Sequence, residues 1–82
     1  MSLINNIIDD YENKGVCLKI QMLEDGETIL FQGNKMSLTF FAKILLALAD
    51  GSEDSFQMSP NGAGQVFFDS KSQFGLYLSK EG

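Results

Sequence analysis

The side chains of this sequence that could do chemistry are carboxylates, and most of them fall into three clusters. The clusters are Asp9-Asp10-Glu12, Glu24-Asp25-Glu27 and Asp50-Glu53-Asp54. Paired carboxylates can serve as acid and base in a glycosidase or can bind a hard cation. The second cluster falls on a predicted turn and the third follows a predicted helix, where solvated acids are common. The third also lacks the ligand order of an EF-hand loop, so we expect neither a metal site nor a catalytic pair.

Nucleophilic catalysis lacks its usual base, because the sequence contains no His. Ser-His and Cys-His pairs cannot be built, and the single Cys17 lies in a predicted strand beside one cation, Lys19. A structural role is the more natural one for this thiol. Gly62 and Gly64 stand between predicted strands, whereas phosphate-binding glycine loops open a helix. The sequence therefore predicts a protein that is not an enzyme and that needs no cofactor or metal.

The charge balance favours a protein partner over a nucleic acid or a membrane. The 82 residues carry a net charge of −5, and all six basic residues are Lys. An acidic surface without Arg repels phosphates, whereas it attracts a basic protein. One Cys cannot form an internal disulfide, and no apolar run approaches the length of about 18 residues that a membrane helix needs. We therefore expect a cytoplasmic protein.

The chain length predicts one domain over residues 1–82. Residues 1–3 and 81–82 resemble the remnants that an expression vector leaves, and we assign them no function. Ile4, Ile7, Ile8 and Tyr11 recur at helical spacing and predict a first helix of about three turns that ends near Gly15.

A β-hairpin is the strongest local prediction. Apolar residues alternate on both sides of Asp25-Gly26, a dipeptide typical of two-residue turns with two positive φ angles. Such a turn pairs Met22 with Ile29 and Ile20 with Phe31, so that both apolar faces coincide.

A second helix is predicted over residues 38–49, with Ser37 as its N-cap and Gly51 after its end. Its polar stripe holds only Thr39, Lys43 and Asp50. We expect the following residues to be its most buried: Phe41, Ile44, Leu45 and Leu48. The remaining apolar arc is wide, so its edges at Phe40 and Leu46 need cover from the first helix or from a second subunit.

Three more strands are predicted around Phe56-Met58, Val66-Phe68 and Phe74-Leu78. The fold class is therefore α+β, in the order α-ββ-α-βββ. We expect a single, mainly antiparallel, five-stranded sheet with two helices on one face. Phe67 and Tyr77 are then expected on the opposite face, as aromatic anchors for a partner.

The segment from Gly33 to Lys80 resembles the small immunity proteins of bacterial polymorphic toxin systems. The shared features are Ser37-Leu38 before an apolar helix that ends at Asp50-Gly51, Gly62-Ala63-Gly64 before Val66-Phe67-Phe68, and Gly75-Leu76-Tyr77-Leu78. The segment from Ser52 to Met58 lacks the His that we associate with members of this group. The resemblance implies a cytoplasmic protein that neutralises a cognate toxin by stoichiometric binding, with no catalytic step.

The leading hypothesis is thus an immunity protein that binds a basic toxin domain. Its expected contact residues lie on turns or on the outer sheet face: Glu24, Asp25, Glu27, Glu53, Asp54, Phe67 and Tyr77. The alternative is a self-associating structural or adaptor module, a homo-oligomer such as a homodimer, built on the wide apolar arc or the outer sheet face. A third hypothesis, a ligand-binding domain with a pocket between helix and sheet, has no residue pattern in its favour.

Overall fold

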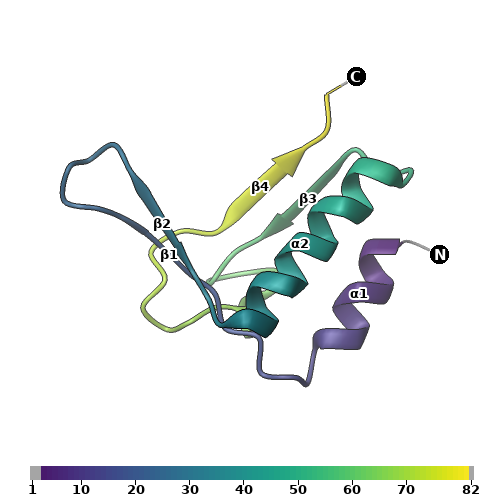
Figure 1. Ribbon diagram of the computed structural model, residues 1–82, viewed down its shortest axis with the longest axis horizontal. Helices are drawn as coiled ribbons and strands as arrows, with labels where there is room; N and C mark the ends of the chain where they lie inside the picture. The colour runs from purple at the N-terminus through teal and green to yellow at the C-terminus, as the bar shows by residue number, and fades with distance from the viewer. Residues whose placement is uncertain (1–2, 82) are drawn as a thin grey trace.

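A computed structural model describes residues 3–81 as two helices packed side by side and two separate β-hairpins (Figure 1). The helices are α1 (Leu3–Tyr11) and α2 (Lys35–Asp50). The hairpins are β1 (Lys19–Met22) with β2 (Ile29–Gln32), and β3 (Ser55–Met58) with β4 (Leu76–Ser79). A short 3-10 helix, η1 (Gln65–Phe67), lies between β3 and β4 in the sequence. Residues 1, 2 and 82 of the expected vector remnants lie outside the described residues.

The prediction of a single five-stranded sheet is wrong, because the structure forms two antiparallel two-stranded sheets. The segment around Val66-Phe68, predicted as the second-last strand, turns instead: the Phe67 amide donates to Gly64 O and the Phe68 amide to Gln65 O. Within residues 3–81, a single isolated parallel bridge, between Leu18 and Phe68, stands where a continuous ladder was expected. The class is still α+β.

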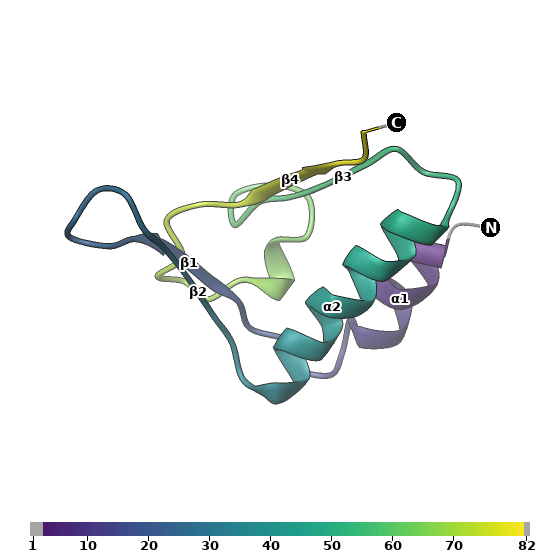
Figure 2. The ribbon, with the colours of Figure 1, turned by 45° about the horizontal axis from the view of Figure 1, so that its top comes forward.

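The 3-10 turn fills the space between the β3–β4 hairpin and the helices (Figure 2). Phe67 points inward from this turn, and its ring centroid lies 4.7 Å from that of Phe40 on α2. Phe40 also contacts Tyr11 of α1, with 5.4 Å between the ring centroids. These three aromatic side chains therefore join both helices and the η1 segment in one apolar core.

The second helix begins earlier and is rotated from its expected position. Asn34 is the N-cap, because its side-chain oxygen accepts the Ser37 amide at 2.8 Å. Ser37, the expected cap, is buried instead, and its hydroxyl accepts the Cys17 amide at 2.9 Å. The buried face of α2 consists of Ser37, Phe40, Ile44, Ala47 and Leu48. The prediction that Leu45 is buried is wrong, because α1 packs beside Phe40 and Ala47 and leaves Leu45 outside.

Candidate protein-binding hairpin

The β1–β2 hairpin has the register that the turn sequence predicts. Met22 pairs with Ile29 and Ile20 with Phe31, so this prediction is confirmed. The turn itself differs, since a four-residue loop from Glu24 to Glu27 connects Leu23 and Thr28, whose amide and carbonyl bond at 2.8 Å. Only Gly26 has a positive φ in this loop, at 71°, so the turn is not the two-residue type with two positive φ angles.

The Asp25 carboxylate organises the loop. It accepts the Glu27 and Thr28 amides at 2.9 Å each and the Thr28 hydroxyl at 2.7 Å. These donors, the Glu27 amide first, lower the pKa of Asp25 because they stabilise its charged form. Asp25 is therefore mainly a structural residue of the loop, and Glu24 and Glu27 are the acids that it presents to solvent.

Replacing Gly26 with Val should reduce the free energy of unfolding by about 1–2 kcal/mol, because a β-branched residue resists positive φ. A Cβ at Gly26 would meet nothing within 4 Å, so crowding cannot cause the loss. Urea denaturation measures the effect. Gly26→Asn is the matched control and should lose less, since Asn tolerates this conformation. Equal midpoints for Gly26→Val and the parent protein would contradict the loop geometry.

The base of the hairpin is held by the chain that precedes β4. The Ile20 amide donates to Ser72 Oγ at 2.9 Å, and the Gln73 amide donates back to Ile20 O at 2.9 Å. The Met22 amide donates to Gln73 Oε1 at 3.1 Å. These bonds close the outer edge of β1 and fix the direction in which the hairpin leaves the body.

The outer half of the hairpin projects away from the helices (Figure 1) and exposes apolar side chains next to the acids. Met22 is 42%, Leu23 41% and Ile29 48% exposed. We name this region, Met22 to Ile29, the hairpin arm. Its acidic tip and apolar sides are complementary to a groove that has apolar walls and basic residues.

Sequence reasoning missed Met22 and Ile29, because the predicted pairing placed them on the same apolar face as Ile20 and Phe31. The hairpin extends past the body, so this side faces solvent at its outer end. Their position as the last strand pair before the loop, two residues from it on either side, was the available signal.

The third acidic cluster, which holds Glu53 and Asp54, lies at the other end of the molecule, where α2 leads into β3 (Figure 1). Glu53 is half-buried and Asp54 is exposed, and the Asp54 carbonyl accepts the Lys80 amide at 2.7 Å. The longest dimension of the molecule is 40 Å. The two clusters therefore do not form one surface.

The two predicted aromatic anchors have different environments. Phe67 is 2% exposed and belongs to the core, so the expectation that it lies on the outer face of a sheet is wrong. Tyr77 is 64% exposed and lies opposite Gln57 in the β3–β4 sheet, which is a different sheet from that of the hairpin arm. The alternation of Val66, Phe67 and Phe68 suggested a strand, but a 3-10 turn aims Phe67 at Phe40.

The environment of Cys17 disfavours the reactive thiolate. Its Sγ lies 3.7 Å from Asp69 Oδ2, to which the thiol donates. Desolvation first, and then the negative charge of Asp69, raise the pKa of this thiol. Within residues 3–81, no group of three or more Cys, Asp or Glu side chains is arranged to hold a metal ion.

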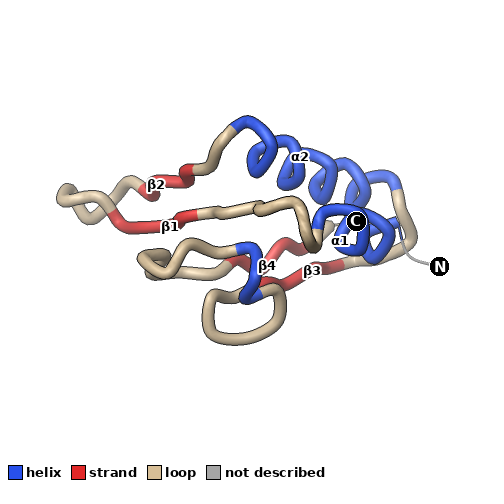
Figure 3. The backbone as a smooth tube through the Cα atoms, turned by 90° about the horizontal axis from the view of Figure 1, so that it is seen from below, coloured by secondary structure: helices blue, strands red, loops and turns tan. Residues whose placement is uncertain are grey.

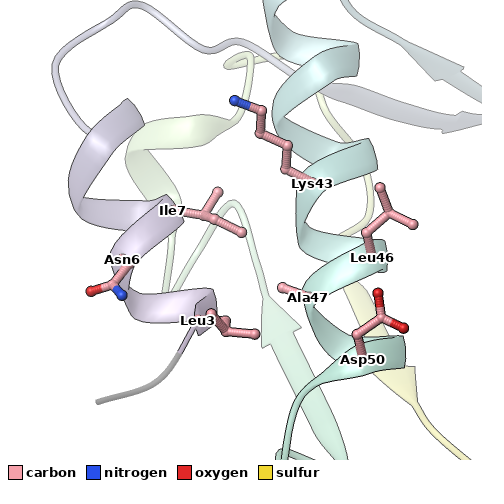
Figure 4. Close-up of a pocket in the computed structure, with 7 residues that line it drawn as sticks. All are labelled: Leu3, Asn6, Ile7, Lys43, Leu46, Ala47 and Asp50. Atoms are coloured by element: carbon pink, nitrogen blue, oxygen red, sulfur yellow. The ribbon is translucent and has the colours of Figure 1, made fainter.

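A hollow of about 310 Å³ lies between α1 and α2 (Figure 4). Its lining is formed by Leu3, Asn6, Ile7, Lys43, Leu46, Ala47 and Asp50. This hollow separates two helices, so it is not the pocket between helix and sheet that the third hypothesis required. Its lining is largely apolar, with Lys43 and Asp50 toward opposite ends (Figure 4).

No helix in the described part of the chain has the length and apolar character needed to cross a membrane. Comparisons with protein-family models, curated proteins and solved structures find no match to this chain.

Proposed function

We propose that this chain is a non-catalytic binding protein that neutralises a toxin domain by forming a stoichiometric complex with it. The observation that supports the proposal is the hairpin arm, in which Met22, Leu23 and Ile29 are exposed beside Glu24 and Glu27. A rigidly based hairpin loses little conformational freedom on binding, which favours a tight complex. The bonds from Ser72 and Gln73 supply that rigidity.

The acids and the apolar side chains of the arm have separate roles in this proposal. Glu24 and Glu27 lie at the tip and add to the net charge of −5, so they attract a basic surface before contact. Met22, Leu23 and Ile29 lose water only when the arm is seated, so they slow dissociation. The partner is therefore a protein with a basic groove whose walls are apolar.

Glu24→Gln combined with Glu27→Gln should slow association roughly tenfold and flatten its salt dependence, with a smaller effect on dissociation. Met22→Ala combined with Ile29→Ala should instead speed dissociation by roughly tenfold or more, as loss of buried contact area does. The probe is the product of the reading frame that adjoins this gene, first in a co-expression rescue and then in binding kinetics at two salt concentrations. Asp25 is left unchanged because it holds the loop.

The matched control is Glu53→Gln combined with Asp54→Asn, which removes two charges at the opposite end of the molecule. Its association rate should stay near that of the parent protein. Failure of the unmodified protein to rescue growth would refute the neutralising role. Rescue that depends on Glu53 and Asp54 but not on the arm would keep that role and reject the arm as the contact surface.

A further inference from the structure

The outer face of α2 carries an exposed apolar row with the spacing of a coiled coil. Leu38, Ala42, Leu45 and Ala49 follow one another at intervals of four, three and four residues. Leu38 is 44% and Leu45 41% exposed, and both alanines are exposed. We name these four residues the α2 seam. Alternating intervals of three and four place side chains on one stripe that packs against another helix.

The seam is left uncovered by the rest of the chain within residues 3–81. α1 packs on a different side of α2, where Ile7 and Ala47 line the hollow between the helices. α2 runs along one edge of the molecule (Figure 3). Of its three charged residues, Lys43 and Asp50 lie off this stripe, and Lys35 lies at its N-terminal end, three residues before Leu38. An uncharged apolar stripe on a protein with net charge −5 is a surface that another helix can cover.

We propose that the α2 seam binds the same seam of a second copy of this chain, with the two helices antiparallel. A two-fold axis between Lys43 and Ile44 places Ala42 opposite Leu45 and Leu38 opposite Ala49 of the second copy. Every layer then holds one large and one small side chain, so the helices keep an even separation. A parallel pair would stack Leu on Leu and Ala on Ala, which leaves alternating crowding and voids.

The charges at the ends of α2 also favour the antiparallel arrangement. The first turn carries Lys35, whereas Asp50, Glu53 and Asp54 lie at or just after the other end. Antiparallel helices bring the Lys end of one copy to the acidic end of the other, and their helix dipoles oppose favourably. Parallel helices would bring both acidic ends together. The hairpin arm lies away from α2 and stays free, so this dimer does not depend on the proposed function.

The first test is the oligomeric state of the full chain, measured by sedimentation velocity under reducing conditions. We expect a reversible dimer over roughly a hundredfold range of protein concentration, because dimerisation follows mass action. Ala42→Glu should give a folded monomer, since residue 42 is exposed and only the seam becomes charged. Gln57→Glu adds the same charge on β3 and should leave the dimer intact. A monomeric parent protein at every concentration would refute the proposal.

Exchanging large and small residues within the seam distinguishes this interface from non-specific apolar association. Ala42→Leu alone and Leu45→Ala alone should each weaken the dimer by about tenfold, because each replaces large–small layers with like pairs. Ala42→Leu combined with Leu45→Ala restores large–small layers and should restore most of the affinity. If Ala42→Leu strengthens association and the combined variant does not recover the affinity, the copies associate through non-specific apolar contact. The proposed large–small packing is then wrong.

Helix direction is tested by cross-linking in a Cys17→Ser background, because Cys17 is exposed. A mixture of the Leu38→Cys and Ala49→Cys variants should form a disulfide between the two different chains. Each variant alone should cross-link poorly, since residue 38 lies far from residue 38 of the second copy. Efficient cross-linking of Ala49→Cys by itself would overturn the antiparallel arrangement.

Discussion

Phe40→Ala should lower the free energy of unfolding by about 3–5 kcal/mol, because it empties the centre of the core. The Phe40 side chain is fully buried and its ring contacts those of Tyr11 and Phe67. One residue thus joins α1, α2 and η1. A domain of 82 residues has a total stability of roughly 4–12 kcal/mol, so this loss is a large part of it.

Urea denaturation followed by circular dichroism measures this effect. Phe40→Leu keeps part of the volume and should remain folded with a smaller loss, which gives a usable value if Phe40→Ala does not fold. Leu46→Ala is the control on the same helix, because Leu46 is 63% exposed and should cost less than about 1 kcal/mol. Similar midpoints for Phe40→Ala and Leu46→Ala would contradict the buried face of α2.

Gly75→Ala should destabilise the protein by about 1–3 kcal/mol or more, because the backbone leaves no room for a Cβ. A Cβ at residue 75 would lie 2.6 Å from Ser59 Cα and still closer to the Met58 carbonyl oxygen. Both neighbours are main-chain atoms, so they cannot rotate away as a side chain can. The β3–β4 pairing of Met58 with Leu76 must shift to accept the methyl group.

The matched control is Gly62→Ala, since a Cβ there would meet only Ser59 Cβ at 3.8 Å. Its stability should stay within about 0.5 kcal/mol of the parent protein, or rise slightly because the unfolded chain loses freedom. The comparison uses thermal unfolding of both variants in the same buffer. If Gly75→Ala and Gly62→Ala have the same melting temperature, β3 and β4 do not approach as closely as described.

The prediction of the candidate site from the sequence was partial. The acids of the hairpin tip follow from their place beside Asp25-Gly26, whose turn sequence fixes their exposure. Their apolar neighbours Met22 and Ile29 could not be identified, because alternation shows which residues share a face but not where the body beneath that face ends. The error at Phe67 has a related cause, since three apolar residues in succession suit a strand and a buried 3-10 turn equally.

The elements that the sequence determined by itself are those whose stabilising contacts are local. The register of Met22 with Ile29 follows from the loop between them, and α2 is specified by a long apolar run that ends before Gly51. Tertiary packing decided which face of α2 is buried, because so wide an apolar arc fits several rotations until α1 and Phe67 occupy one side. It also decided that the hairpins form two sheets. A single sheet requires the residues Gln65–Phe67 to form an extended strand that pairs with distant segments. These residues form a 3-10 turn instead, so the sheet is not continuous.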